Sequence, residues 1–161
     1  MIYDSKTAEN AALLEAANRM CAAARTAPKA RGIDLICTLI LTGEDKDALA
    51  AHMESIAGEK GEGYAFFIRD AGCLRKAGAV VLIGTKGAGE DGGLLPNFDE
   101  INLGIAVGSA CAAAADARVD TRVMYSVGAA AIESGLFGEE VRSALGIPLS
   151  VSGKSPFFDR K

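Results

Sequence analysis

The chain has only one histidine, His52, and its four cysteines include no Cys-x-x-Cys pair. The cysteines are widely spaced, at Cys21, Cys37, Cys73 and Cys111. Zinc and iron–sulfur centres are held by closely spaced cysteine and histidine ligands, so the sequence predicts no metal site and no iron–sulfur cluster. Each cysteine has apolar or small neighbours, a setting typical of reduced, buried thiols in a cytosolic protein.

Positive charge is also scarce, with 17 lysines and arginines against 21 acidic residues, a formal net charge of -4 and a pI near 5.1. Proteins that bind nucleic acid rely on clustered cations, so this balance argues against a nucleic-acid partner. No apolar run reaches the roughly 18 residues of a membrane span, and residues 1–10 lack the apolar core of a signal peptide. We therefore expect a cytoplasmic protein with no membrane partner, whose 50% hydrophobic composition builds a single domain over residues 1–161.

The basic joint, residues 25–34, links an alanine-rich helical run to an apolar strand. Pro28 cannot donate a hydrogen bond to a helix and disfavours helical geometry at Ala27, so the helix should end there, while Gly32 allows a close approach of the backbone. Three cations fall within seven residues: Arg25, Lys29 and Arg31. Converging cations and backbone N–H groups suit a small phosphorylated or acidic ligand. A plain helix stop with a solvated basic rim would give the same pattern.

Hydrophobic periodicity predicts a succession of helices and strands. Helices are expected over residues 7–24, 44–57 and 97–116, with shorter helical turns over 71–76, 129–134 and 139–145. Strands are expected over residues 34–41, 64–68, 79–83, 122–127 and 147–152. Five strands and about five helices predict an α+β (α/β) fold in which helices flank a mixed sheet of about five strands.

Residues 87–92 satisfy the pattern G-x-G-x-x-G after a predicted strand, as a dinucleotide-binding turn should. The third glycine is not followed by a helix start, however, and Glu90 and Asp91 would repel a pyrophosphate. No Walker-type Gly-Lys-Ser/Thr follows either. A flexible connector or lid is therefore our interpretation of residues 84–96.

Five segments carry a family resemblance: residues 24–34, 80–84, 102–110, 114–128 and 146–160. They are similar to a family of uncharacterised bacterial and archaeal proteins described as containing a ferredoxin domain. Members of that family usually carry a cysteine cluster between the Val-Leu-Ile-Gly strand and the long helix, whereas residues 85–95 of this chain hold no cysteine. The resemblance therefore implies a member that lacks the iron–sulfur cluster.

A second resemblance is to flavin-dependent nitroreductases. In those enzymes a helix that ends in an Ala-Pro-Ser-type turn leads into a strand, and a later Asp-Leu-Gly-Ile-Ala-like helix forms much of a dimer core around FMN. Residues 27–29 and 102–106 are similar to these two motifs, although the N-terminal arginine-rich phosphate motif is absent. The resemblance implies a nitroreductase-like fold, bound FMN and a homodimer. It also implies a cofactor-binding set: Arg25, Thr26, Pro28, Lys29, Arg31, Lys154 and Arg160.

Two functions from different classes remain open. One is an FMN-linked oxidoreductase of unknown substrate, in which the cofactor performs the hydride chemistry and the chain needs no catalytic acid. The other is a non-catalytic protein, either a small-ligand-binding module or an electron-transfer partner that has lost its iron–sulfur cluster.

Gly104, Gly108 and Ala112 recur every four residues along the predicted long helix. Small residues at this spacing leave a shallow groove that another helix must fill. We expect that helix to come from a second chain in a symmetric homodimer, because closed two-fold association is the commonest assembly. The alternative is that the long helix is only the central core element of the monomer.

Overall fold

The structure is a computed structural model that describes residues 1–87 and 97–158. Its helices are α1 (Ser5–Thr26), α2 (Gly43–Lys60), α3 (Ala65–Lys76), α4 (Phe98–Asp116) and α5 (Tyr125–Glu133), with short 3₁₀ helices η1 (Ala30–Gly32) and η2 (Glu62–Tyr64). Its strands are β1 (Ile36–Thr42), β2 (Ala79–Thr85), β3 (Asp120–Thr121) and β4 (Ser143–Ser150). The strands pair antiparallel in the order β1-β2-β4-β3.

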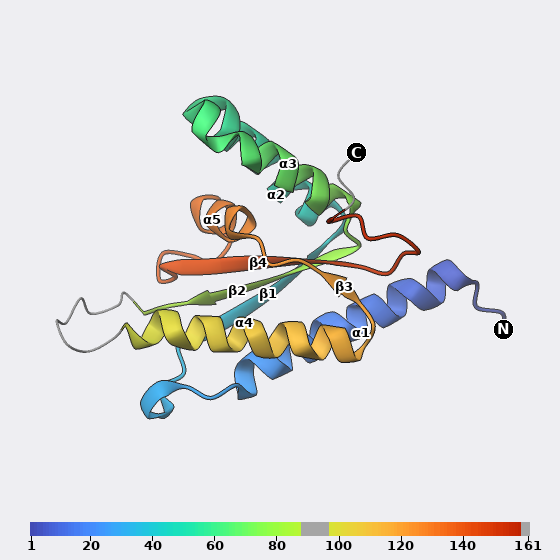
Figure 1. The fold of residues 1–161 in the computed structure, drawn as a ribbon, viewed down its shortest axis with the longest axis horizontal. Coiled ribbons are helices and arrows are strands. Elements are labelled where there is room, and N and C mark those ends of the chain that lie inside the picture. Colours follow the sequence, from blue (N-terminus) through green and yellow to red (C-terminus); the bar gives the residue numbers. More distant parts are fainter. Residues whose placement is uncertain (88–96, 159–161) are drawn as a thin grey trace.

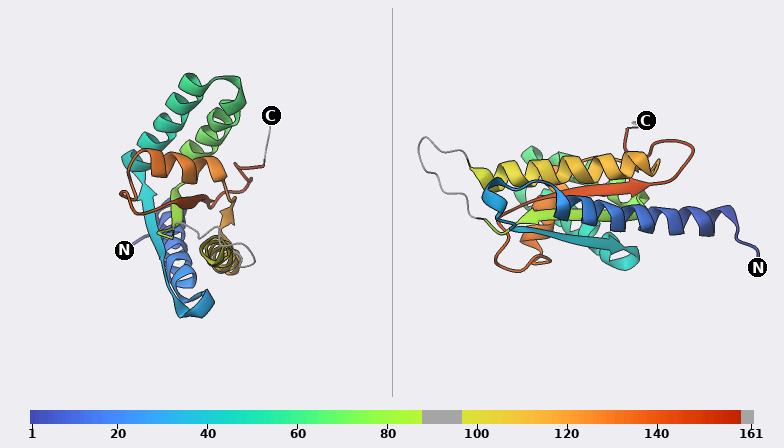
Figure 2. Two further views of the ribbon diagram at one scale, coloured as in Figure 1. Left: turned by 90° about the vertical axis from the view of Figure 1, so that its left-hand side faces the viewer. Right: turned by 90° about the horizontal axis from the view of Figure 1, so that it is seen from below.

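The sheet lies between two layers of helices (Figures 1 and 2). Helices α1 and α4 cover one face, and α2, α3 and α5 cover the other. Strand β2 is buried along its whole length, and its side chains alternate between the two cores. Val81 and Ile83 pack in the α1–α4 core, whereas Val80 and Leu82 pack in the opposite one. Burial on both faces explains why this strand is continuously hydrophobic.

The predicted α+β class, with helices flanking a sheet, is confirmed, but the described residues form four antiparallel strands where five in a mixed sheet were expected. The predicted strand over residues 64–68 is wrong, because these residues end η2 and begin α3. A short apolar run fits a strand or a helix equally well. The helix prevails because it directs Phe67, Ala71 and Leu74 into one core.

Two predictions near the C-terminus are also wrong. The strand expected over residues 122–127 does not form: β3 ends at Thr121, Met124 makes only an isolated bridge to Gly146, and α5 begins at Tyr125. A helical turn was expected over residues 139–145, but the last three of these residues begin β4. Helix α5 packs closely on β4, since a Cβ on Gly128 would lie 2.0 Å from the carbonyl oxygen of Ala144. This tertiary contact, which Gly128 permits, determines both elements.

The two ends of the sheet hold different parts of the predicted cofactor site. At one end, called the joint end here, Ile36 of β1, Thr85 of β2 and Ser143 of β4 lie side by side, next to the basic joint. Strand β4 then runs to Ser150, so at about 3.3 Å per residue the C-terminal segment leaves the sheet roughly 23 Å away. Figure 1 shows the basic joint and the C-terminal segment at opposite ends of the molecule.

Two further expectations concern the glycine-rich segment and the membrane. The connector or lid predicted over residues 84–96 lies mostly outside the described residues, and its first two residues end β2. Within residues 1–87 and 97–158, no helix combines the length and the apolar composition needed to cross a membrane.

Candidate functional site

Helix α1 ends where the basic joint begins. Thr26 is the last helical residue, and its hydroxyl donates to the carbonyl oxygen of Ala22 at 3.1 Å. Ala27 caps the helix by donating its N–H to the carbonyl oxygen of Ala23 at 3.0 Å. Pro28 follows at a point where it has no helical hydrogen bond to break. The helix end predicted from Pro28 is confirmed.

Lys29 turns inward and caps α1. Its side chain is 5% exposed, and Nζ donates to the carbonyl oxygens of Ala24 at 2.7 Å and Arg25 at 2.5 Å. Nζ also lies 4.0 Å from Oδ1 of Asp34. A cation at a helix C-terminus satisfies carbonyls that have no helical partner and interacts favourably with the helix dipole. Because an ammonium has only three donors, Lys29 has little capacity left for a ligand.

Arg25 is held by a carboxylate of the same joint. Its Nη1 donates to Oδ2 of Asp34 at 2.6 Å, and Oδ1 of Asp34 accepts the N–H of Ile36 at 3.0 Å. Partial burial works to raise the pKa of Asp34, but the hydrogen bonds from Arg25 and Ile36 hold that pKa below its ordinary value. The ionised carboxylate therefore neutralises part of the joint's positive charge and ties the end of α1 to β1.

Arg31 is the cation of the joint that faces outward. Its backbone φ of 57° lies in the left-handed region, which costs a residue other than glycine roughly 1–3 kcal/mol. The guanidinium carbon lies 5.1 Å from the centroid of the Phe98 ring at the start of α4, a cation–π contact. Within the part of the chain that the structure describes, no carboxylate pairs with Arg31. Among the described residues, its N–H groups therefore have no carboxylate acceptor, and an oxyanion could bind them.

The turn that carries Arg31 is attached to α4 by Asn102. Oδ1 of Asn102, a residue that is 5% exposed, accepts the N–H of Ala30 at 2.9 Å. Phe98 and Asn102 are one helical turn apart, so one face of α4 contacts η1 twice. Sequence reasoning did not place either residue in the site, because Asn102 appeared only within a resemblance motif and tertiary burial of an amide leaves no local signal.

Of the remaining residues of the predicted set, the structure describes Lys154 alone, and it does not lie near the joint. Lys154 lies in the segment that follows β4, which leaves the sheet at the end opposite the joint. Arg160 lies outside the described residues. Within one chain, the structure groups five members of the set: Arg25, Thr26, Pro28, Lys29 and Arg31.

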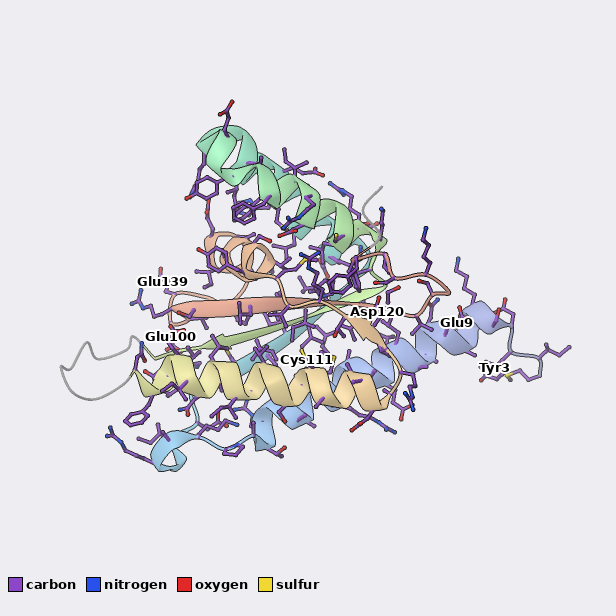
Figure 3. The ribbon with its side chains drawn as sticks, in the orientation of Figure 1. Tyr3, Glu9, Glu100, Cys111, Asp120 and Glu139 are labelled. Carbon is purple, nitrogen blue, oxygen red and sulfur yellow. The ribbon has the colours of Figure 1, made fainter. Side chains whose placement is uncertain are left out.

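Polar side chains of other elements also meet at the joint end. Nζ of Lys86 pairs with Glu140 at 2.7 Å, and Glu100 accepts a hydrogen bond from the hydroxyl of Ser143. Figure 3 shows Glu100 in the first turn of α4. Burial raises the pKa of the Cys37 thiol on β1, and the nearby charge of Lys86 offsets this only in part. Cys37 is therefore a thiol at neutral pH. In the described residues, no three histidine, cysteine, aspartate or glutamate side chains gather closely enough to hold a metal ion.

One buried hydroxyl–carboxylate pair lies on the other face of the sheet. The hydroxyl of Ser126 donates to Oδ2 of Asp70 at 2.6 Å, and Oδ1 of Asp70 binds Arg69 at 2.8 Å. A nucleophile must be reached by its substrate, whereas Ser126 is 1% exposed. The pair therefore serves to join α5 to α3.

Helix α4 carries two stripes of small residues. The first stripe is fully buried against α1: Ala106, Ala110 and Ala114. The second stripe is exposed: Gly104, Gly108 and Ala112. A Cβ added to Gly104 or Gly108 would meet no atom within 4 Å, and exposed Ile101 and Ile105 lie beside this stripe. Helix α4 is thus a core element of the monomer, and the described residues leave the groove over its second stripe open.

The sequence matches proteins of one family along its length. Residues 93–160 match a family described as "Uncharacterized protein containing a ferredoxin domain". A protein of Archaeoglobus fulgidus, itself described as uncharacterized, is 38% identical over 188 aligned positions that cover 99% of this chain and 98% of that protein.

The fold is similar to that of several solved flavoproteins. An FMN-dependent nitroreductase from Mycobacterium smegmatis, in complex with NADPH, has a TM-score of 0.67 at 13% identity, over 89% of this chain and 81% of that chain. A nitroreductase with bound FMN from Desulfitobacterium hafniense has a TM-score of 0.66 at 14% identity, over 96% of this chain and 81% of that chain. A BluB-like flavoprotein from Clostridium difficile has a TM-score of 0.57 at 19% identity, over 87% of this chain and 84% of that chain. At these identities the likeness establishes the fold, which is that of the nitroreductases.

Proposed function

The chain belongs to the family of uncharacterized proteins that contain a ferredoxin domain, and from this membership and its nitroreductase fold we propose that it is a homodimeric, FMN-linked oxidoreductase of the cytoplasm. The fold supports the cofactor because similar solved structures are described as FMN-dependent or as having bound FMN. The observation that carries the proposal is Arg31, an exposed cation with no carboxylate partner among the described residues, held over Phe98. The cytoplasmic location is supported by four cysteines that are all unpaired.

Among the three cations of the joint, Arg31 is the one that pairs with no described carboxylate, so we assign it to binding an oxyanion such as a phosphate. The planar guanidinium of Arg31 can bind an oxyanion through two parallel hydrogen bonds. Lys29 and Arg25 already donate to groups of the same chain, so we assign them to holding the turn in place. Thr26 and Pro28 end α1 and set the direction in which the turn leaves it. Bound FMN would supply the hydride chemistry, and the chain would bind and orient it without a catalytic acid.

The homodimer is supported by surface that the described residues do not cover. The groove over Gly104 and Gly108 is open, and residues 5–12 of α1 are exposed on every side. Figure 2 shows this end of α1 extending past the sheet. Lys154 follows β4 at the end of the sheet opposite the joint, so in a dimer we assign it to the joint of the other copy. A second copy would cover the open groove, and it is the partner that we propose.

Arg31→Ala tests the proposed cofactor site. We expect it to weaken FMN binding by roughly 1.5–3 kcal/mol, the contribution of a hydrogen bond to a charged group, while the melting temperature changes little. The measurement is a calorimetric titration of FMN into the apo protein, with a thermal melt of each variant. Arg19→Ala is the matched control, because Arg19 is an exposed arginine of α1 that pairs only with Glu15 among the described residues.

The colour of the purified protein separates the two classes of function. A yellow protein with flavin absorption supports the oxidoreductase. A colourless protein that stays apo with added FMN would favour the non-catalytic alternative, a small-ligand-binding module or an electron-transfer partner that has lost its cluster. Equal FMN affinity of the wild type and Arg31→Ala would remove Arg31 from the site even if flavin binds.

A further inference from the structure

We propose that Asn102 is the positioning residue of the Arg31 site, because its side-chain amide holds the turn that directs the Arg31 guanidinium over Phe98. The inference rests on the proposed function for the identity of the ligand, FMN. The placement of the turn is a property of the chain without ligand, and it can be tested separately.

The turn has a backbone that its own sequence does not favour. Arg31 and Gly32 are successive left-handed residues, with φ values of 57° and 67°. Within the turn, the N–H of Gly32 donates to Lys29 at 3.0 Å and the N–H of Ile33 donates to Ala30 at 3.2 Å. These two bonds are internal, so they would survive if the turn moved as a unit. A residue with a side chain persists in the left-handed region only where its surroundings hold it there.

Asn102 supplies the connection between the turn and α4, beside the contacts of Lys29 with α1 and of Arg25 with Asp34. Among the described residues, the hydrogen bond from the Ala30 N–H to Oδ1 of Asn102, at 2.9 Å, is the one that joins η1 to another helix or strand. The amide oxygen must face the turn, since only an acceptor can pair with this N–H. Asn102 is 5% exposed, so breaking the bond would leave a buried polar group without this partner.

The position of Asn102 on α4 also sets the geometry of the cation. Phe98 lies one helical turn before Asn102 on the same face, and its ring centroid is 5.1 Å from the guanidinium carbon of Arg31. The bond to Ala30 therefore fixes the turn immediately before Arg31, while the ring supports the far end of the side chain. If the bond is lost, the turn is free to relax out of the left-handed conformation, and the guanidinium leaves the ring.

The first experiment measures FMN affinity in a double-mutant cycle of Asn102→Leu and Arg31→Ala. Because Asn102 acts through Arg31, Asn102→Leu alone should weaken FMN binding by about threefold to tenfold, the effect of one lost hydrogen bond. The double variant should bind no more weakly than Arg31→Ala alone. Ser109→Ala is the matched control. Like Asn102, Ser109 is a residue of α4 whose side chain bonds a backbone group of another element, but its hydroxyl donates to the carbonyl oxygen of Ala23 in α1, at 3.1 Å, and not to η1. It should leave FMN affinity unchanged.

The second experiment uses the protein without FMN and measures two NMR signals. The Ala30 amide should exchange slowly with solvent, and the Arg31 side-chain protons should show the ring-current shift of Phe98. Both signatures should disappear in Asn102→Leu and remain in Asn102→Asp, whose carboxylate can still accept the Ala30 N–H. Asn102→Asp also keeps the test valid if Asn102→Leu does not fold.

Multiplicative losses in the double variant, or unchanged NMR signals in Asn102→Leu, would overturn the positioning role. If wild-type protein binds no FMN, the proposed function fails, and the NMR arms still decide whether Asn102 positions Arg31. If FMN binds but Asn102→Leu has wild-type affinity and wild-type signals, the positioning role fails while the oxidoreductase proposal stands.

Discussion

Replacing Gly108 with leucine would test the proposed dimer, because the change has opposite consequences in a lone chain and at an interface between helices. In a lone chain, Gly108 is exposed and a Cβ there meets no described atom within 4 Å, so we expect a leucine side chain to extend into solvent. Glycine in a helix interior is about 1 kcal/mol less favourable than alanine, and leucine ranks close to alanine. A monomeric protein should therefore become more stable by roughly 0.5–1 kcal/mol.

In a dimer that packs through this groove, the same side chain would enter the contact between the two helices. Extra side-chain volume in a packed contact costs about 1–3 kcal/mol, and two-fold symmetry places the change on both chains, so the dimer loses about 2–6 kcal/mol. The helix-propensity gain applies to the separated and the associated chains alike. Since about 1.4 kcal/mol corresponds to a tenfold change, the dissociation constant should rise about thirtyfold or more.

Light scattering over a concentration series measures the outcome. We expect the wild type at micromolar concentration to have twice the chain mass of 16.5 kDa, and Gly108→Leu to approach 16.5 kDa at the same concentration. Gly58→Leu is the matched control, because Gly58 is also an exposed glycine inside a helix, α2, with no atom within 4 Å of its Cβ position. A wild type that stays at 16.5 kDa, or a Gly108→Leu protein that dimerises as tightly as the wild type, would refute the reasoning.

Three further predictions concern stability. Lys29→Met should lower the free energy of unfolding by roughly 1–2 kcal/mol in a denaturant melt, because the buried ammonium caps α1, and an unchanged melt would contradict this role. The pKa of Asp34 is held below its ordinary value by Arg25 and the backbone, against the effect of burial, so its contribution is present above the unfolded-state pKa, about 3.9, and is lost as pH falls through the folded-state pKa. Asp34→Asn should therefore flatten the dependence of the melting temperature on pH below about pH 4, and a slope like that of the wild type would count against the ion pair. His52→Leu should leave the free energy of unfolding unchanged or raise it by up to about 1 kcal/mol, because the buried Nε2 of His52 has no hydrogen-bond partner among the described residues. A clear fall in the melting temperature would show that His52 has a partner.

Elements determined by local chemistry were predicted well from the sequence. The end of α1 follows from the missing N–H and the ring of Pro28, and the strand expected over residues 79–83 lies within β2. The run over residues 64–68 was misassigned because five apolar residues satisfy either period, and the choice depended on the core that α2 and α5 provide. The start of α5 and β4 depended in the same way on their mutual contact at Gly128.

In the candidate site, too, some features follow from neighbouring residues and others from tertiary contacts. The sequence by itself determined that Arg25, Lys29 and Arg31 share one joint, because residues within seven positions of one another stay close in space. Only the tertiary structure decided that Lys29 turns to the carbonyls of α1 while Arg31 faces outward over Phe98. It also decided which stripe of α4 packs on α1 and which stays open. The physical reason is range: proline, glycine and helix periodicity act through the chain's own neighbours, whereas the direction of a charged side chain is set by partners that are distant in sequence, as Asn102 is from Ala30.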